Sequence, residues 1–178
     1  MIETGLKKLD QFLGGGIKEG LITDISGQNS TGKTQLAFQI CINALKNGKE
    51  ILFQDTTGEF RPERLVEMLK IRKLDPILLD KIKVGRITNS IQQLEFLSKI
   101  VTNDFSLIII DNATDLFSFE YSKKEQSFEK HLTFMKYMQN LASIAINTKI
   151  PIVVTNIIRS FNEHEKENLE KSIGMFTH

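Results

Sequence analysis

The chain has 178 residues, of which 40% are hydrophobic and 25% are charged, with a formal net charge of +1. These values are typical of a globular protein with a substantial core, and they exclude a strongly basic protein that binds nucleic acid through its overall charge. No apolar run is long enough to cross a bilayer, and residues 1–5 do not begin a signal peptide. We therefore expect one cytoplasmic domain over residues 1–178, without a membrane partner. The single cysteine, Cys41, cannot form an internal disulfide and is expected to be a small core residue.

Residues 1–20 contain apolar side chains at the spacing of a short helix, followed by three glycines that end it. The apolar residues are Leu6, Leu9, Phe12 and Leu13. We interpret this segment as a cap over the core.

Residues 27–34 match the phosphate-binding pattern G-x-x-x-x-G-K-[ST] at every fixed position. Gly27 and Gly32 let successive backbone N–H groups turn into one concavity at a helix N-terminus, where an anion is favoured. Lys33 adds a charge for the β- and γ-phosphates and is our first candidate catalytic residue, and the Thr34 hydroxyl can ligate Mg²⁺. The nucleotide-binding residues that we predict here are Gly27, Gln28, Asn29, Ser30, Thr31, Gly32, Lys33, Thr34 and Gln35.

The flanking residues support this interpretation of the motif. Residues 21–26 are typical of a buried strand, and residues 34–45 have the apolar content of a helix. A phosphate-binding loop requires a preceding strand and a following helix. The alternative is a glycine-rich turn that binds no ligand.

The rest of the chain alternates between strand and helix patterns. The predicted strands are 50–54, 81–87, 107–111 and 150–155, and the predicted helices are 63–69, 90–101 and 125–148. Residues 112–124 are predicted to be a loop, and the tail from Ile157 to His178 shows no clear strand. This alternation predicts an α/β fold, a mainly parallel sheet with helices on both faces.

Two helix predictions are specific enough to be checked. Ser90 and Gln93 have the spacing of a capping box at the start of one helix. The longest helix carries apolar residues along one side, and we expect its methionines, Met135 and Met138, to fill the core rather than to form a partner groove. The residues of this side are Phe128, Leu132, Met135, Met138, Leu141 and Ala145.

Asp111 ends an unbroken apolar strand, as in the Walker B pattern of nucleotide-binding proteins. A carboxylate at this position can hold the hydration shell of Mg²⁺ opposite Thr34. The alternative is a strand that simply meets its loop. With a phosphate-binding loop in the same chain, we predict that Thr34 and Asp111 form a magnesium site.

Three segments resemble the archaeal RadA and RadB recombinases of the RecA superfamily, namely residues 4–35, 55–64 and 153–156. The similarity extends over nearly the whole chain, and the run from Phe60 to Arg64 is more specific than the phosphate loop alone. The chain lacks the separate N-terminal domain and the polymerisation linker of RadA, which makes it more similar to RadB. The resemblance implies a P-loop NTPase with a RecA-like core that takes ATP and Mg²⁺, with Arg64 near the adenine ring. A guanidinium can stack on such a ring, and the alternative for Arg64 is a solvated helix charge.

The chain departs from the family pattern at three places. The catalytic glutamate of the family falls at Thr57, whose hydroxyl is a very poor base. The glutamine that senses the γ-phosphate falls at Ile157, which cannot form a hydrogen bond with a phosphate. The third departure is that the family core continues with further strands after the position of His178, so the last strands are expected to be missing. Glu59, two residues after Thr57, is a second candidate catalytic residue if the loop shifts its register.

These losses affect hydrolysis more than binding, so we expect an ATP-binding accessory protein or paralogue in homologous recombination and DNA repair, with slow hydrolysis at most. Its expected partners are a recombinase or another repair protein, in a homo- or hetero-oligomer. One alternative is an active recombinase that hydrolyses ATP on single-stranded DNA. The other is a KaiC-like signalling ATPase, against which the run from Phe60 to Arg64 argues.

The resemblance places DNA-facing loops at residues 112–124 and 157–171. Between Arg159 and Lys171 acids outnumber bases, so little affinity for single-stranded DNA would come from counterion release. Aromatic residues near these loops could stack on bases, but they pack onto a sheet more often. These residues are Phe117, Phe119, Tyr121 and Phe161.

Overall fold

Five strands form one sheet in the order β1-β5-β4-β2-β3, and every neighbouring pair is parallel. This computed structural model describes residues 1–100 and 104–158. The strands are β1 (Ile22–Gly27), β2 (Glu50–Asp55), β3 (Ile82–Arg86), β4 (Phe105–Asp111) and β5 (Ile152–Ile157). The predicted α/β fold with a parallel sheet is confirmed, and each strand lies within a few residues of its predicted range.

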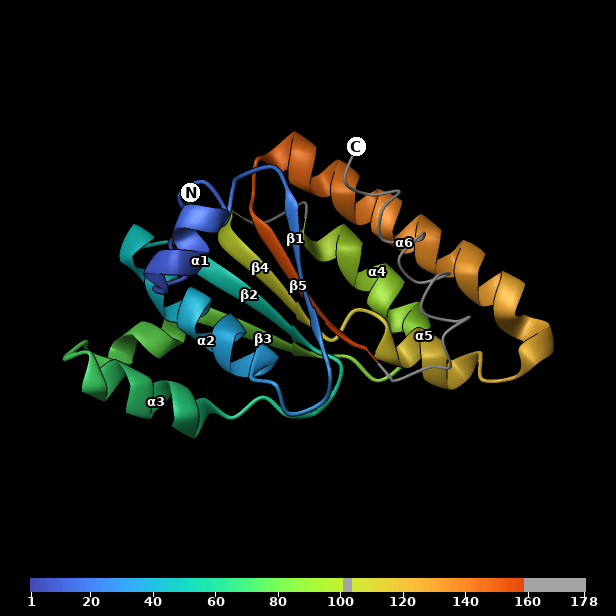
Figure 1. Cartoon of the computed structure of the whole chain (residues 1–178), viewed down its shortest axis with the longest axis horizontal. Helices are drawn as coiled ribbons and strands as arrows, with labels where there is room; N and C mark the ends of the chain where they lie inside the picture. The colour runs from blue at the N-terminus through green and yellow to red at the C-terminus, as the bar shows by residue number, and fades with distance from the viewer. Residues whose placement is uncertain (101–103, 159–178) are drawn as a thin grey trace.

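The α-helices cover both faces of the sheet (Figure 1). They are α1 (Lys7–Phe12), α2 (Lys33–Ala44), α3 (Pro62–Ile71), α4 (Ser90–Ile100), α5 (Asp115–Glu120) and α6 (Ser127–Thr148). Short 3-10 helices occupy Leu45–Asn47, Pro76–Lys81 and Lys124–Gln126. The layer with α1, α2 and α3 lies on one face, and the layer with α4, α5 and α6 lies on the other.

Strand β4 lies at the centre of the sheet and contributes to both halves of the core. Leu107 and Ile109 belong to the apolar cluster under α2 and α3, whereas Ile108 and Ile110 belong to the cluster under α4 and α6. All four side chains are fully buried. Because both faces of the strand are covered, apolar residues follow one another without the alternation of a half-exposed strand.

An aromatic cluster anchors the loop that follows β2. The ring of Phe60 packs on Phe53 of β2 and Phe38 of α2, with centroid separations of 4.9 and 5.5 Å. The rings of Phe38 and Phe53 are also 5.5 Å apart. Tilted and edge-on pairs of this kind are favourable arrangements of aromatic rings. The cluster therefore holds the loop close to the first turn of α2.

The prediction of a loop over residues 112–124 was wrong, because this segment contains α5. A helix of six residues is not stable by itself, so tertiary contacts must hold it. Phe117 is buried and packs against the rings of Phe134 and Tyr137, with centroids 5.4 and 5.6 Å away. These contacts join residues that are distant in the sequence, and the local pattern could not show them.

The predicted capping box at Ser90 was also wrong. Asn89 performs this role, since its side chain accepts the N–H of Gln92 at 2.8 Å. Ser90 instead donates its N–H and its hydroxyl to Glu120 of α5. The Gln93 side chain donates to the carbonyl of Ala113 at 3.1 Å, so it links α4 to the end of β4.

The apolar side of α6 is buried only along its second half. Phe128 and Leu132 are 73% and 52% exposed, whereas Tyr137, Leu141 and Ala145 are buried. A helix of 22 residues spans about 33 Å, and the longest strand, with seven residues, spans about 23 Å. The first turns of α6 therefore extend beyond the sheet, whereas Met138, one of the two methionines predicted to fill the core, packs against the buried cluster under α4 and α6.

The N-terminal segment is attached to the body by an antiparallel bridge between Ile2 and Ile17. Each residue donates its N–H to the carbonyl of the other, at 2.9 and 2.7 Å. Gly16 has a φ of +128°, and a Cβ placed there would collide with the carbonyl oxygen of Ile2. Gly14 also has a positive φ, but its Cβ would meet only the flexible end of Lys18, at 3.5 Å.

We expect Gly16→Ala to lower the free energy of unfolding by more than about 2 kcal/mol, because backbone strain and a backbone collision combine. Gly14→Ala, the matched control, should cost about 1 kcal/mol, since only the strain applies. Urea unfolding of the two variants measures the difference. Equal losses would show that the bridge between Ile2 and Ile17 does not constrain the segment.

Candidate nucleotide-binding site

The parallel register brings the carboxyl ends of four strands to one edge of the sheet. Gly27 of β1 lies beside Ile157 of β5, and Asp55 of β2 lies beside Asp111 of β4. Ligands of open α/β sheets bind at this edge. A pocket of about 350 Å³ opens here, lined by Asn29, Ser30, Thr31, Gly32, Lys33, Thr34, Gln35, Phe38, Thr57, Glu59, Arg61, Arg64, Asp111, Asn112 and Ile157.

The phosphate loop has the backbone that its sequence predicts. Gly32 is the residue before α2 and has a left-handed conformation, with φ of +90°. Glycine has no side chain to cap the helix, so the first N–H groups of α2 can be bound by an anion. Gly27 is equally constrained, since a Cβ there would lie 2.9 Å from the Thr31 hydroxyl oxygen.

Lys33 folds back over its own loop. Its ammonium group donates to the carbonyl oxygens of Gly27 and Gln28, at 3.1 and 2.7 Å. Gly27 and Gln28 are thus joined to the predicted site through Lys33, although they are not among the residues that line the pocket. Phosphate oxygens are strong acceptors for an ammonium group, so a bound phosphate would compete with these carbonyls for the Lys33 side chain.

Thr34 and Asp111 are in direct contact. The Thr34 hydroxyl donates to Oδ2 of Asp111 at 2.8 Å, and the Thr155 hydroxyl of β5 donates to Oδ1. Asp111 is buried, and this burial raises the pKa of its carboxyl above the ordinary value, while the two hydroxyl groups act in the opposite direction. Removal of a carboxylate from water is unfavourable unless a cation or donors compensate. A divalent cation beside Thr34 would supply that compensation.

The oxygen atoms of Thr34 and Asp111 fit Mg²⁺ only if a phosphate supplies further ligands. Over residues 1–100 and 104–158, no group of three His, Cys, Asp or Glu side chains is arranged to hold a metal ion. Mg²⁺ commonly uses one or two protein ligands, water and substrate phosphates. Thr34 and Asp111 supply the protein part of such a set.

The loop after β2 is held by the Asp55 carboxylate. Its Oδ1 accepts the Thr57 N–H and hydroxyl, both at 3.0 Å, and the Gly58 N–H at 2.7 Å. Arg86 of β3 lies 3.6 Å from the same oxygen and donates to the Asp55 carbonyl at 3.1 Å. Thr57 and Glu59 both line the pocket, so the fixed loop brings both of these predicted residues to the site.

Arg64 lies at the rim of the pocket, beside the last residue of the predicted loop set. Its Nε donates to the Gln35 side chain at 2.8 Å, and Gln35 in turn donates to the sulfur of Met68 at 3.2 Å. The first turn of α2 is therefore linked to α3. The proposed contact of Arg64 with adenine stays a prediction.

Sequence reasoning missed several residues of the site. Thr155 was noted only as part of a family segment, yet its hydroxyl is bound to Asp111. Asp55 was likewise not recognised as the residue that holds the following loop. Asn112 and Arg61 line the pocket; they lie in the segments 111–112 and 55–64, which the sequence predicts at this edge, but neither was given a role of its own. The available signal for Asn112 was its position directly after Asp111, since polar residues at strand ends gather at this edge.

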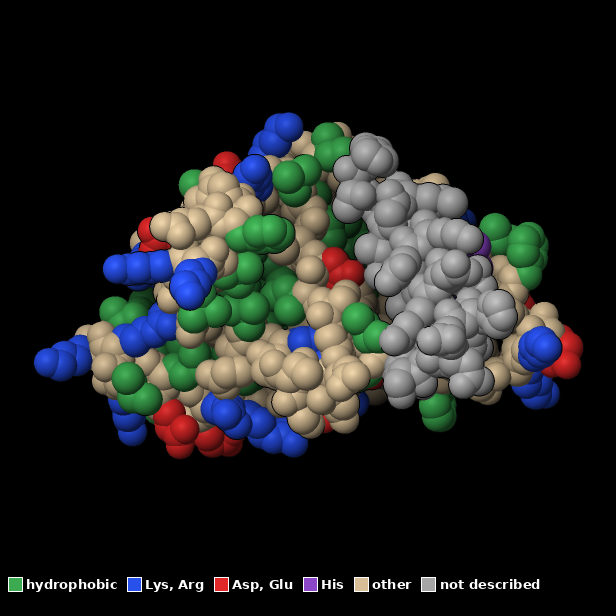
Figure 2. Space-filling model, in the orientation of Figure 1, with side chains coloured by type: hydrophobic (Ala, Val, Ile, Leu, Met, Phe, Trp, Pro, Cys, Tyr) green, Lys and Arg blue, Asp and Glu red, His purple; other side chains and the backbone are tan. Residues whose placement is uncertain are grey.

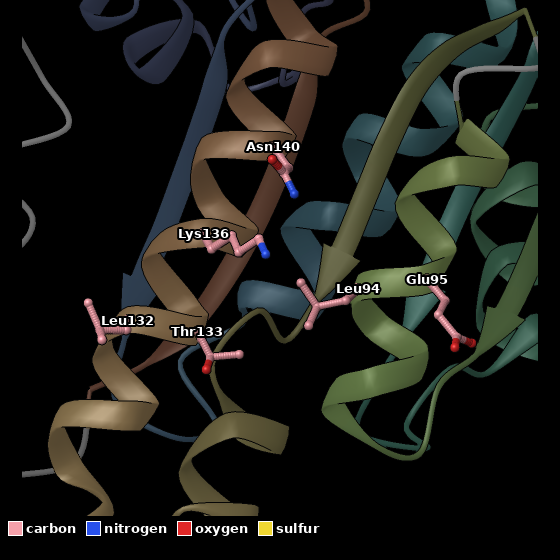
Figure 3. Close-up of a pocket in the computed structure, with 6 residues that line it drawn as sticks. All are labelled: Leu94, Glu95, Leu132, Thr133, Lys136 and Asn140. Carbon is pink, nitrogen blue, oxygen red and sulfur yellow. The ribbon is translucent and has the colours of Figure 1, made fainter.

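A second hollow, of about 510 Å³, lies between α4 and α6 (Figure 3). It is lined by Leu94, Glu95, Leu132, Thr133, Lys136 and Asn140. It shares no residue with the pocket at the phosphate loop and contains no glycine-rich turn. The pocket at the phosphate loop is the stronger candidate for a nucleotide site, because a helix N-terminus, a lysine and an aspartate meet there.

The resemblance places two DNA-facing loops in this chain, and the structure describes only the first of them in full. Residues 112–124 contain α5, so this segment is partly helical, with Phe119 80% exposed. Residues 159–171, including Phe161, lie outside the described residues. No helix over the described ranges is both long and apolar enough to cross a membrane.

A five-stranded parallel sheet, with a phosphate loop after β1 and an aspartate at the end of β4, is consistent with a RecA-like P-loop core. A sequence profile of the Rad51 family matches residues 1–174, almost the entire chain. The chain belongs to the Rad51 family, whose ATPases bind ATP and Mg²⁺.

Within this family, the chain is similar to archaeal RadB and RadA proteins. The DNA repair and recombination protein RadB of Thermococcus gammatolerans is 37% identical over 160 residues, which cover 88% of this chain and 69% of that protein. RadB of Thermococcus onnurineus is 36% identical over 183 residues, covering 98% and 77%. RadA of Cenarchaeum symbiosum is 36% identical over 171 residues, covering 90% of this chain but 43% of RadA. The resemblance to RadA and RadB is confirmed, and the chain spans less than half of that RadA.

We expect Asp111→Asn to change ligand-free stability and magnesium binding in opposite directions. A carboxyl group with a raised folded-state pKa favours folding most when protonated, so its contribution is lost as pH rises from the ordinary value of 3.8. Near pH 7 the ligand-free variant should therefore unfold about 2 °C or more above the parent. Its Mg²⁺-dependent affinity for ATP should fall about tenfold, because a neutral amide attracts the cation less.

Thermal unfolding at about pH 4 and pH 7, followed by ATP titration with and without Mg²⁺, measures both effects. Asp104→Asn is the control, because Asp104 is exposed and forms a surface ion pair with Lys49. A variant that loses stability at pH 7 and keeps its magnesium-dependent affinity would contradict the assignment of Asp111.

Proposed function

We propose that this protein binds ATP with Mg²⁺ in the phosphate-loop pocket and acts as an accessory RadA/RadB-like protein in homologous recombination and DNA repair. The observation that carries the proposal is the hydrogen bond between Thr34 and Asp111, two residues 77 positions apart in the chain. It joins the two halves of a magnesium–phosphate site in one pocket. The role in recombination and repair is supported by family membership and by the names of the relatives.

The residues around the pocket divide the binding of ATP among them. The N–H groups at the start of α2 and the Lys33 ammonium would hold the phosphates, and Thr34 and Asp111 would hold Mg²⁺ and its water shell. When bound, Mg²⁺ neutralises phosphate charge. Arg64 and Gln35, at the rim, would lie beside the base.

Slow hydrolysis is the second part of the proposal. Thr57 stands where the family has its catalytic glutamate, and its hydroxyl donates to Asp55. Such a hydroxyl has no useful basicity near neutral pH, and loss of a general base costs about 10²–10⁴ in rate. Ile157 also lines the pocket and offers no hydrogen bond to a phosphate. Both residues support a site in which bound ATP is hydrolysed only slowly.

Retention of ATP is sufficient for an accessory role. A γ-phosphate can order a segment or stabilise a partner interface while it stays bound, and hydrolysis serves only to release it. We propose a recombinase or another repair protein as the partner. Homo-oligomers and hetero-oligomers are both compatible with this role.

One observation favours a second candidate, a DNA-stimulated ATPase. Glu59 lines the pocket, and its N–H donates to the Thr57 hydroxyl at 3.2 Å. A carboxylate therefore lies two residues after the position of the family's catalytic glutamate. Against DNA binding, Lys and Arg side chains on the visible described face lie scattered with acids among them, not in a continuous stripe (Figure 2). Such an arrangement gives little counterion release.

ATP affinity and turnover, measured with and without single-stranded DNA, test the proposal. We expect Mg²⁺-dependent ATP binding and a slow rate that DNA does not raise. Lys33→Ala should weaken ATP binding by at least about tenfold, because a charge-assisted contact is lost. Lys136→Ala, on α6 and outside the pocket, should leave the affinity unchanged. Absence of binding would overturn the proposal, and strong stimulation by DNA would favour the second candidate.

Thr57→Glu should raise the ATPase rate by about tenfold or more, because it restores a carboxylate where the family has its catalytic base. Thr57→Gln is the matched control, because glutamine has the length of glutamate and a polar end group but no basicity. Steady-state phosphate release measures both variants. An equal rate in Thr57→Glu, Thr57→Gln and the parent would show that Thr57 is not the cause of slow turnover.

A further inference from the structure

Asn112 is a buried polar residue with one unsatisfied group. It is 1% exposed and directly follows Asp111. Its N–H donates to the Thr56 hydroxyl oxygen at 2.7 Å, and its carbonyl accepts that hydroxyl at 2.6 Å. Its side-chain oxygen accepts the N–H and the hydroxyl of Thr114, at 2.8 and 3.1 Å. Only the side-chain nitrogen, Nδ2, is buried without a hydrogen-bond partner.

The contacts around Asn112 fix the orientation of this amide. Because Thr114 holds Oδ1, the amide cannot flip without the loss of two hydrogen bonds. The next residue is also clamped, since Ala113 donates its N–H to Thr155 at 3.0 Å and accepts the Gln93 side chain at 3.1 Å. The two hydrogens of Nδ2 are therefore presented in a fixed direction rather than by a mobile side chain.

A buried donor without an acceptor is unfavourable, and native proteins rarely retain one without a reason. Asn112 lines the phosphate-loop pocket together with Lys33, Asp111 and Ile157. An amide nitrogen can only donate, so its missing partner must be an acceptor. In a pocket of this composition, phosphate oxygens are the acceptors that the neighbouring residues also require.

The position of Asn112 indicates which phosphate it meets. The N-terminus of α2 would hold the inner phosphates, and a magnesium ion held by Thr34 and Asp111 would neutralise charge on the outer ones. Asn112 follows Asp111, and its backbone is hydrogen-bonded to Thr56, the residue before Thr57. Thr57 and Ile157, which line the same pocket, occupy the positions where the resemblance implies the catalytic and sensing residues of the family.

We propose that Nδ2 of Asn112 donates to an oxygen of the γ-phosphate and makes the site prefer ATP over ADP. This inference rests on the proposed function, because it requires a triphosphate in the pocket. It assigns to Asn112 a contact that Ile157 cannot make.

The test compares ADP with adenosine 5′-(β,γ-imido)triphosphate, a triphosphate that is not hydrolysed, by titration calorimetry of the full chain with Mg²⁺. Asn112→Ala should reduce affinity for the triphosphate about tenfold, the effect of one charge-assisted hydrogen bond. Its affinity for ADP should change less than about twofold. The control Asn140→Ala, on α6 and outside this pocket, should change neither affinity.

The outcomes separate this inference from the proposed function. If the parent binds neither nucleotide, the proposed function fails. If the parent binds both and Asn112→Ala keeps the same preference, or loses both affinities equally, Asn112 only supports the loop and the inference alone is overturned. Should Asn112→Ala not fold by circular dichroism, Asn112→Ser replaces it. Its shorter hydroxyl should also lower the preference for the triphosphate, and an unchanged preference would again overturn the inference.

Discussion

The contact between Thr34 and Asp111 is the interaction on which the site depends. It connects the first turn of α2 to the central strand of the sheet, and it requires the parallel order in which β5 and β4 lie between β1 and β2. Thr155 completes the connection from β5. Three elements that are distant in the sequence thus share one carboxylate. Any change in strand order or register would separate the phosphate loop from Asp111.

Burial of the Asp111 carboxylate lowers the stability of the ligand-free protein. A buried carboxylate is unfavourable without a cation, and two hydroxyl donors only partly compensate, since the pKa of Asp111 is still raised. The side-chain nitrogen of Asn112, which has no hydrogen-bond partner, belongs to the next residue in the chain. A folded protein that retains both groups at one pocket gives up stability there, and a magnesium-bound triphosphate would restore it for both groups at once.

The loop after β2 shows that a backbone can be fixed independently of the side chains that it presents. Asp55, Arg86 and the Phe60 ring hold the loop firmly at the pocket. What differs is the side chain presented, a threonine hydroxyl where the family has a carboxylate. The position of the backbone and the chemistry of the side chain are therefore separable here.

The sequence by itself determined the phosphate loop, the five strands and Asp111, because these signals are local. Motif spacing, glycine positions and unbroken apolar runs depend on neighbours in the chain. Only the tertiary structure decided that Asn89 caps α4, that α5 forms within residues 112–124, and that Phe128 lies beyond the sheet. It also decided that Asn112 is buried with a free donor. Each of these depends on contacts between residues far apart in the chain, and such contacts exist only after the layers have packed.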